Sequence, residues 1–169
     1  MIVRPAILED AAGIREIVNL IIRDTTISFK PYEYSLEDTE KLIANARGIF
    51  VAEQGSKIIG YASYDQFRNG PGYARTMEHS IALLPDARGL GAGRALMDTV
   101  ETHARAAGVG SLWAGVSGEN PLGVEFHRRM GFEEVARLPK VGFKFDRWLD
   151  LTLMRKWLDP DGDADAPNE

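Results

Sequence analysis

The sequence feature that most constrains this chain is a glycine-rich turn between an apolar run and a helical pattern. The turn reads Arg-Gly-Leu-Gly-Ala-Gly-Arg over residues 88–94, after the apolar run 81–84. Apolar residues at helical spacing follow it over 95–107. The order strand, turn, helix exposes free backbone N–H groups at a helix N-terminus, where a phosphate can bind. Three glycines keep the main chain accessible, so the segment predicts a pyrophosphate-binding loop.

Two other phosphate loops do not fit these residues. A P-loop needs Gly-Lys-Ser or Gly-Lys-Thr, whereas Gly93 is followed by Arg94 and Ala95. A dinucleotide-binding G-x-G-x-x-G counted from Gly89 ends on Arg94 instead of on glycine. The spacing matches Arg-x-x-Gly-x-Gly and resembles the acyl-coenzyme A pyrophosphate loop of the GNAT superfamily of N-acetyltransferases. A glycine turn that only caps a helix is the alternative.

The composition predicts one soluble globular domain. Of 169 residues, 44% are hydrophobic and 27% charged, and the net charge is −5. No long basic run suits nucleic acid, and no apolar run reaches the roughly 18 residues of a membrane span. The sequence has no cysteine, which excludes a thiol nucleophile, and its three histidines are not spaced as metal ligands. With no signal-peptide core, we expect a cytoplasmic protein with no metal, nucleic-acid or membrane partner.

Hydrophobic periodicity predicts an α/β domain over residues 1–158. An antiparallel hairpin is expected around Gly55, and a capping box formed by Ser35 and Asp38 should open a helix. Strands are expected at 2–7, 49–53, 57–64, 73–84, 112–116, 135–138 and 149–154. Residues 159–169, with four Asp and two Pro, are interpreted as a disordered acidic tail. The pattern is a mixed sheet flanked by helices, and the GNAT resemblance implies a mostly antiparallel sheet that is splayed at the coenzyme A site.

Three further segments narrow the resemblance. They are Thr-Met-Glu-His-Ser-Ile at 76–81, Asn120 followed by His-Arg-Arg-Met-Gly-Phe at 127–132, and Val-Gly-Phe-Lys-Phe-Asp-Arg-Trp-Leu-Asp-Leu at 141–151. All three resemble phosphinothricin and methionine sulfone or sulfoximine acetyltransferases. This resemblance implies acetyl-CoA-dependent acetylation of the α-amino group of a small amino-acid analogue, by direct transfer in a ternary complex. It also implies a homodimer with its contact near the C-terminal segment.

Two departures from that family affect the expected site. Gly123 stands where the family usually has Ser, so a side-chain hydroxyl near the coenzyme is missing. Arg75 lies one residue later than the family's strand arginine. One step along a strand reverses the face to which a side chain points, so this shift leaves open whether Arg75 binds a substrate carboxylate and which amino acid is preferred.

Acetyl transfer to an amine requires proton transfers that two residues suit. The substrate ammonium, with a pKa of about 10, must lose a proton before its nitrogen can attack, and the leaving thiolate, whose thiol has a pKa of about 8.5, benefits from gaining one. Glu78 is the candidate base, with an ion-paired strand carboxylate as the alternative. His127 stands where many superfamily members have Tyr; the resemblance implies that it works with Glu78, and a packed helix histidine is the alternative. We assign both jointly. His79 should point opposite Glu78 and is interpreted as structural.

The binding residues follow from the same pattern. The strand edge should pair with the pantetheine arm, and a main-chain N–H near Leu83 should bind the thioester oxygen. The coenzyme-binding residues are Ile81, Ala82, Leu83, Arg88, Gly89, Leu90, Gly91, Ala92, Gly93, Arg94 and Asn120. The candidate substrate-binding residues are Phe29, Tyr73, Arg75, Thr76 and Met77.

Two other functions stay open at this stage. An N-acetyltransferase could act on a polyamine or a protein N-terminus, which an acidic chain would suit by charge. A non-catalytic acyl-CoA-binding module would keep the glycine loop without turnover. The presence of both Glu78 and His127 favours the enzyme, because an inert module has no need of either.

Overall fold

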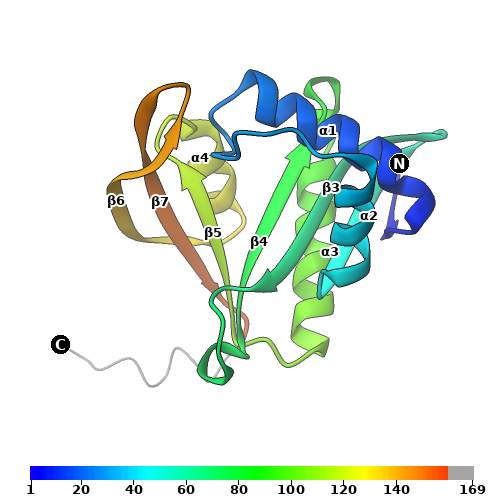
Figure 1. Ribbon diagram of the computed structural model, residues 1–169. Helices are drawn as coiled ribbons and strands as arrows, with labels where there is room; N and C mark the ends of the chain where they lie inside the picture. The colour runs from blue at the N-terminus through cyan, green and yellow to red at the C-terminus, as the bar shows by residue number, and fades with distance from the viewer. Residues whose placement is uncertain (160–169) are drawn as a thin grey trace.

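The computed structural model describes residues 1–159 and forms a seven-stranded sheet with helices on both faces (Figure 1). The strands are β1 Ile2–Pro5, β2 Gly48–Gln54, β3 Lys57–Gln66, β4 Thr76–Leu83, β5 Ser111–Ser117, β6 Glu133–Lys144 and β7 Arg147–Trp157. The helices are α1 Ala11–Asp24, α2 Leu36–Asn45, α3 Ala92–Ala106 and α4 Pro121–Arg129. Except for Asp159, the predicted acidic tail lies outside the described residues.

The sheet is mixed and mostly antiparallel, which confirms the predicted fold class. Its order is β1-β2-β3-β4-β5-β7-β6, and only β4 and β5 pair in parallel. That parallel ladder runs from Thr76 opposite Ser111 to His79 opposite Ala114 and stops there. On its other side β4 pairs with β3 as far as Leu83. Residues 80–83 therefore have a strand partner on one side only, and β4 and β5 diverge above this point (Figure 1).

Apolar helix faces hold the layers together. Figure 1 shows α1 and α2 on one face of the sheet and α3 and α4 on the other. Ile14 and Ile17 of α1 and Leu96 and Val100 of α3 are fully buried against the strands. Burial of each such side chain contributes about 1.5–3 kcal/mol, so α1 and α3 are each held on their own face of the sheet by apolar contacts. No helix within residues 1–159 has the length and apolar character needed to cross a bilayer.

Local signals determine where several elements begin. Ser35 and Asp38 form the predicted capping box, with the Asp38 N–H donating to Ser35 Oγ at 3.1 Å. Gly55 has φ +64° in the β2–β3 turn, as the hairpin requires. The predicted strand 73–84 begins late, because Pro71–Tyr73 form a 3₁₀ turn and β4 starts at Thr76.

The C-terminal hairpin is longer than the sequence predicts. Strand β6 spans Glu133–Lys144 and β7 spans Arg147–Trp157, whereas 135–138 and 149–154 were expected. Their register shifts between Leu138 and Gly142, where Lys140 has φ +51°. The irregularity around Pro139 interrupts the alternating pattern, which is why the sequence underestimates β6.

Candidate functional site

The glycine loop places free amides at the start of a long helix. Gly91 is the N-cap of α3 with φ +81°, and Gly89 has φ +78°, both in the left-handed region that favours glycine. The first helical hydrogen bond runs from the Ala95 N–H to the Gly91 carbonyl at 3.0 Å. The amides of residues 92–94 precede it and form the positive end of the helix dipole. A Cβ at Gly89 or Gly91 would meet nothing within 4 Å, so the loop is open to an anion.

The edge of β4 leads to this loop. Residues 81–83 pair with β3 only, so their remaining main-chain groups face the divergence from β5. Those groups can bind an extended chain in the manner of an added strand. The loop then turns through the 3₁₀ helix Pro85–Ala87 into 88–91 and α3. An elongated ligand with a diphosphate at one end therefore matches the edge and the loop together.

Glu78 lies on the α2 face of β4, below the divergence. Glu78 lines a hollow of about 260 Å³ together with Leu42 and Asn45 of α2 and with Ala46, the C-cap of that helix. Burial raises the pKa of Glu78 above its usual range. A Cβ added at Gly115 would lie 2.9 Å from Glu78 Oε1, so glycine there leaves room for the carboxylate beside β5. A half-buried carboxylate with a raised pKa suits a general base.

His127 lies on the opposite face of the sheet and contacts His79. Their Nε2 atoms are 3.0 Å apart. His79 Nδ1 is 2.9 Å from the Trp113 carbonyl, and His127 Nδ1 is 2.6 Å from the Gly123 carbonyl. Burial lowers the pKa of each ring, and a charge on His127 would lower the pKa of His79 further, so the two rings resist carrying a proton each. His79 thus points away from Glu78, as expected from strand alternation, into a contact that the sequence did not reveal.

The structure does not bring Glu78 and His127 together. Adjacent residues of a strand point to opposite faces, and Glu78 faces α2 while its neighbour His79 meets α4. The backbone of the sheet therefore lies between the two side chains. Any reaction that uses both residues must therefore take place across the sheet, where β4 and β5 separate.

The loop between α1 and α2 crosses toward the C-terminal hairpin. In Figure 1 the blue segment that leaves α1 passes β5 on its way toward β6 and β7 before returning to α2. Phe29 of this loop packs against β6 so closely that a Cβ at Gly142 would overlap its ring. Lys144 is buried, and its ammonium donates to the carbonyls of Thr25 and Ser28 at 2.7 Å each. Phe29 is therefore held against β6, in a loop that the C-terminal hairpin anchors.

A second anchor of the same loop involves residues that sequence reasoning missed. Thr26 Oγ1 donates to Glu119 at 2.9 Å, and Arg147 forms an ion pair with the same carboxylate. The hydrogen bonds from Arg147, and to a smaller extent from Thr26, lower the pKa of Glu119 to about 2. Lys144 and Arg147 both belong to the 141–151 segment, so the segment was recognised but its role as an anchor was not. Only contacts between distant parts of the chain reveal that role.

The other candidate substrate residues lie at the far end of β4. Tyr73 is in the 3₁₀ turn that precedes β4. Arg75 Nε donates to the Gly108 carbonyl at 3.0 Å, and its guanidinium pairs with Asp159 at 2.6 Å. Thr76 opens the parallel ladder, and Met77 is fully buried on the α3 side of the core. All four therefore lie away from the diverging end of β4, and none of them is brought to Phe29, which packs against β6.

Asn120 is used as a helix cap. Its Oδ1 accepts the Gly123 N–H at 3.0 Å at the start of α4. A Cβ at Gly123 would overlap the Asn120 amide group. The glycine that replaces the family's serine is therefore matched to this position of Asn120, since a serine there would force the amide to move.

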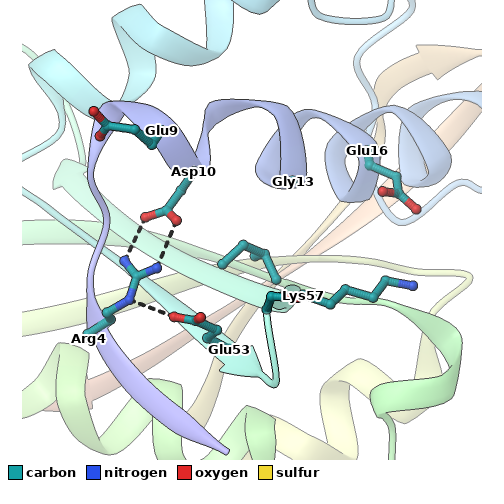
Figure 2. A pocket seen from close by; sticks show the side chains of 9 residues that line it. Arg4, Glu9, Asp10, Gly13, Glu16, Glu53 and Lys57 are labelled. Carbon is teal, nitrogen blue, oxygen red and sulfur yellow. Dashed lines mark hydrogen bonds and ion pairs between the residues drawn. The ribbon is translucent and has the colours of Figure 1, made fainter.

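A larger hollow, of about 310 Å³, lies elsewhere and has a structural explanation. Figure 2 shows Arg4 pointing at Asp10 and Glu53, which also line it. Arg4 Nη1 is 2.7 Å from Asp10 and its Nε 2.9 Å from Glu53. The guanidinium lowers the pKa of Asp10, which also accepts the Ile7 N–H. This network ties β1 to the start of α1 and to β2, and its polar groups are occupied by one another.

Comparison with known proteins places this geometry in context. Residues 14–132 match the model of the "Acetyltransferase (GNAT) family". An L-methionine sulfoximine/L-methionine sulfone acetyltransferase of Pseudomonas paraeruginosa is 35% identical over 94% of this chain and 95% of its own.

Solved structures agree in fold. A phosphinothricin acetyltransferase of the GNAT superfamily from Sinorhizobium meliloti, in complex with acetyl-CoA, has a TM-score of 0.90 and 30% identity, covering 99% of this chain and 93% of its own. A ribosomal-protein-alanine N-acetyltransferase from Brucella melitensis has a TM-score of 0.90 and 34% identity, covering 93% and 99%.

Proposed function

This chain belongs to the acetyltransferase (GNAT) family, whose enzymes use acetyl-CoA, and we propose that it acetylates the α-amino group of a small amino-acid analogue. Phosphinothricin, methionine sulfone and methionine sulfoximine are the acceptor type that we propose. The observation that carries the proposal is the separation of β4 from β5 between Glu78 and the glycine loop. It offers one strand edge to an acyl donor and, on the α2 face, a carboxylate to an amine.

The donor side fits acetyl-CoA by its chemistry. Open amides at the α3 N-terminus suit the diphosphate, with Arg88 and Arg94 at either end of the loop. The one-sided edge at 81–83 suits the amide groups of the pantetheine arm. In this arrangement the thioester lies near the point where the β4–β5 ladder ends, and main-chain N–H groups there would bind its oxygen as charge develops.

The acceptor side fits a primary amine. We propose that Glu78 accepts the proton of the substrate ammonium, directly or through one water, and that the freed amine attacks the thioester carbonyl carbon. The C–N bond forms, and the nitrogen gives its second proton to Glu78, which has passed the first to solvent. The C–S bond breaks, and the electron pair leaves with sulfur. The raised pKa of Glu78 brings it nearer that of the ammonium, which eases this proton transfer. Phe29 and the anchored α1–α2 loop would cover the acceptor.

His127 would act on the other reactant. Because it lies on the α4 face, we propose that it serves the departing sulfur while Glu78 serves the amine. This divides the joint role that the sequence assigned to the two residues. It also requires donor and acceptor to be bound at once, as in direct transfer within a ternary complex.

One experiment tests the proposed function. Thiol release from acetyl-CoA is followed with a panel of amines: methionine sulfone, methionine sulfoximine, phosphinothricin, spermidine and an alanine-initiated peptide. We expect release with the first three and a large loss of kcat in Glu78→Gln. Release only with amines that lack a free carboxylate would refute the amino-acid proposal. Coenzyme binding by calorimetry with no release for any amine would favour a non-catalytic module.

A protein N-terminus is the second candidate acceptor. The likeness to a ribosomal-protein-alanine N-acetyltransferase from Brucella melitensis favours it. The alanine-initiated peptide in the panel distinguishes the two, since a peptide carries no carboxylate on its first residue. Faster release with the peptide than with methionine sulfone would select this second function.

We also propose a homodimer formed through the hairpin patch. This patch consists of Val141, Phe143, Phe145 and Trp148, each at least half exposed. Trp148 of β7 pairs with Phe143 of β6, and the two rings pack edge to face. Exposed aromatic clusters of this kind favour protein contacts. Analytical ultracentrifugation should give a dimer for the wild type and a monomer for Trp148→Arg. We place the enzyme in the cytoplasm, where acetyl-CoA is supplied.

A further inference from the structure

The pair formed by His79 and His127 has three hydrogen-bonding contacts to satisfy. Two of them join Nδ1 atoms to the carbonyls of Trp113 and Gly123. A carbonyl oxygen only accepts, so each Nδ1 must carry a hydrogen. The third contact joins the two Nε2 atoms at 3.0 Å, and it needs a hydrogen on one of them.

Counting these hydrogens gives three on two rings. Two neutral imidazoles carry two hydrogens in total. A neutral pair would leave either two Nε2 lone pairs facing each other or one Nδ1 lone pair facing a carbonyl. All three contacts are satisfied only when the pair holds one additional proton and a single positive charge.

The surroundings limit the pair to that one charge. The rings are 5% and 6% exposed and pack against Phe126 and Phe132. In residues 1–159, no carboxylate hydrogen-bonds to either ring; the neighbouring Glu78 faces the other side of the sheet. Burial therefore opposes a second proton, while the three contacts favour the first. Such a pair binds one proton and can release it.

The pair also lies where the proposed reaction needs a proton. His79 and Ala114 form the last step of the parallel ladder, so the two rings lie under the point where β4 and β5 separate. Phe126, next to His127, packs near Gly93 at the start of α3, which joins this point to the glycine loop. Both Nδ1 hydrogens are held by carbonyls, so the exchangeable proton is the one between the Nε2 atoms.

We propose that His79 is a positioning residue of the acetyl transfer, which shares one proton with His127 and keeps it ready for the departing sulfur. This inference rests on the proposed function. When the C–S bond breaks, its electron pair goes to sulfur, which takes the shared proton and leaves the pair neutral. The amine nitrogen loses one proton before attack and a second as the C–N bond forms, and both pass through Glu78 to solvent. The pair regains one proton from solvent before the next turnover, so each cycle releases one proton.

The proton count can be measured without any activity. Protein labelled with ¹⁵N-histidine has six ring nitrogens, because the chain has only three histidines, and His103→Gln removes two of them. Between about pH 5 and 8 we expect both Nδ1 atoms of the pair to stay protonated while the two Nε2 atoms together gain one proton in a single step. Nε2 atoms that both stay unprotonated, or rings that each gain a proton independently, would overturn the proposal.

Kinetics tests the positioning role. His79→Gln removes the ring, and His79→Phe keeps aromatic packing on Phe132 if the first variant folds poorly. For either variant we expect kcat to fall about 100-fold, KM for acetyl-CoA to change less than about twofold, and the pH dependence of kcat to shift. His103→Gln serves as the matched control with unchanged kcat.

Two results separate this inference from the proposed function. Wild-type kcat and pH profile in both folded His79 variants would overturn the positioning role even if the proton is shared. A wild-type protein that acetylates no amine would instead overturn the proposed function, while the nitrogen spectra would still decide whether the proton is shared.

Discussion

Lys144→Met should loosen the α1–α2 loop and weaken binding of the acceptor. The Lys144 residue is 4% exposed, and its ammonium donates two hydrogen bonds of 2.7 Å, to the carbonyls of Thr25 and Ser28. Methionine matches the length and apolar stem of lysine and removes both donors. The change therefore isolates the two contacts that tie the loop to β6.

The size of the effect follows from those contacts. A hydrogen bond to a charged group contributes about 1.5–3 kcal/mol, so two contribute roughly 3–6 kcal/mol. Burial of the ammonium opposes this and lowers the pKa of Lys144, and replacing it regains part of that cost. We expect a net destabilisation of about 3 kcal/mol, which for a chain of this size is a fall in Tm of roughly 6–12 °C.

Two measurements check this expectation. Thermal unfolding gives Tm, and steady-state kinetics should show KM for the amine raised about tenfold or more with KM for acetyl-CoA unchanged, because only the acceptor side is loosened. Lys140→Met is the matched control, since Lys140 is an exposed lysine of the same strand. It should leave both quantities at wild-type values.

The reasoning would be refuted by a Lys144→Met protein that is as stable as the wild type with the same KM for the amine. An equal rise in KM for both substrates would also contradict it, because the loop would then support the coenzyme as well. A loss of stability alone, without a change in either KM, would show that the anchor does not reach the acceptor site.

Four further expectations follow from single positions. Glu78→Gln should lower kcat about 10²–10⁴-fold and abolish the acid limb of the pH profile, which lies above the usual glutamate pKa because burial raises the pKa of Glu78. The folded protein favours the protonated carboxyl, so the stability that Glu78 contributes is lost as the pH rises through its pKa in the folded state. The variant should therefore have a higher Tm than the wild type at pH 7. Gly115→Ala should lower kcat, measured at saturating substrates, about 10–100-fold, because the new Cβ would lie 2.9 Å from Glu78 Oε1 and displace the carboxylate. Gly91→Ala should cost about 1–2 kcal/mol of stability at φ +81° and raise KM for acetyl-CoA severalfold in titrations of the donor. Arg75→Ala should leave both KM values within about twofold, because its guanidinium is held by Gly108 and Asp159.

Local patterns predicted much of the fold. The glycine loop, the capping box at Ser35 and the hairpin at Gly55 depend on neighbours within a few residues, and the structure contains all three. The C-terminal hairpin was underestimated because the β6 irregularity near Lys140 depends on pairing with β7, which no local pattern records.

The site was harder to predict than the fold. Strand alternation gave the opposite directions of Glu78 and His79, but not the ring that His79 meets, because His127 is 48 residues away in the chain. Arg75 was a substrate candidate by resemblance, and its ion pair with Asp159 depends on how the chain end folds back. Lys144 and Glu119 were missed for the same reason: their partners lie in the α1–α2 loop.

The division of the sheet into two chemically separate sides has an evolutionary consequence. Substitutions in the α1–α2 loop or in the hairpin at Gly142 and Lys144 alter one side alone, while the α3 N-terminus and its glycines stay untouched. Under the proposed function, a gene lineage can therefore change the acceptor of its enzyme while the coenzyme site is inherited intact.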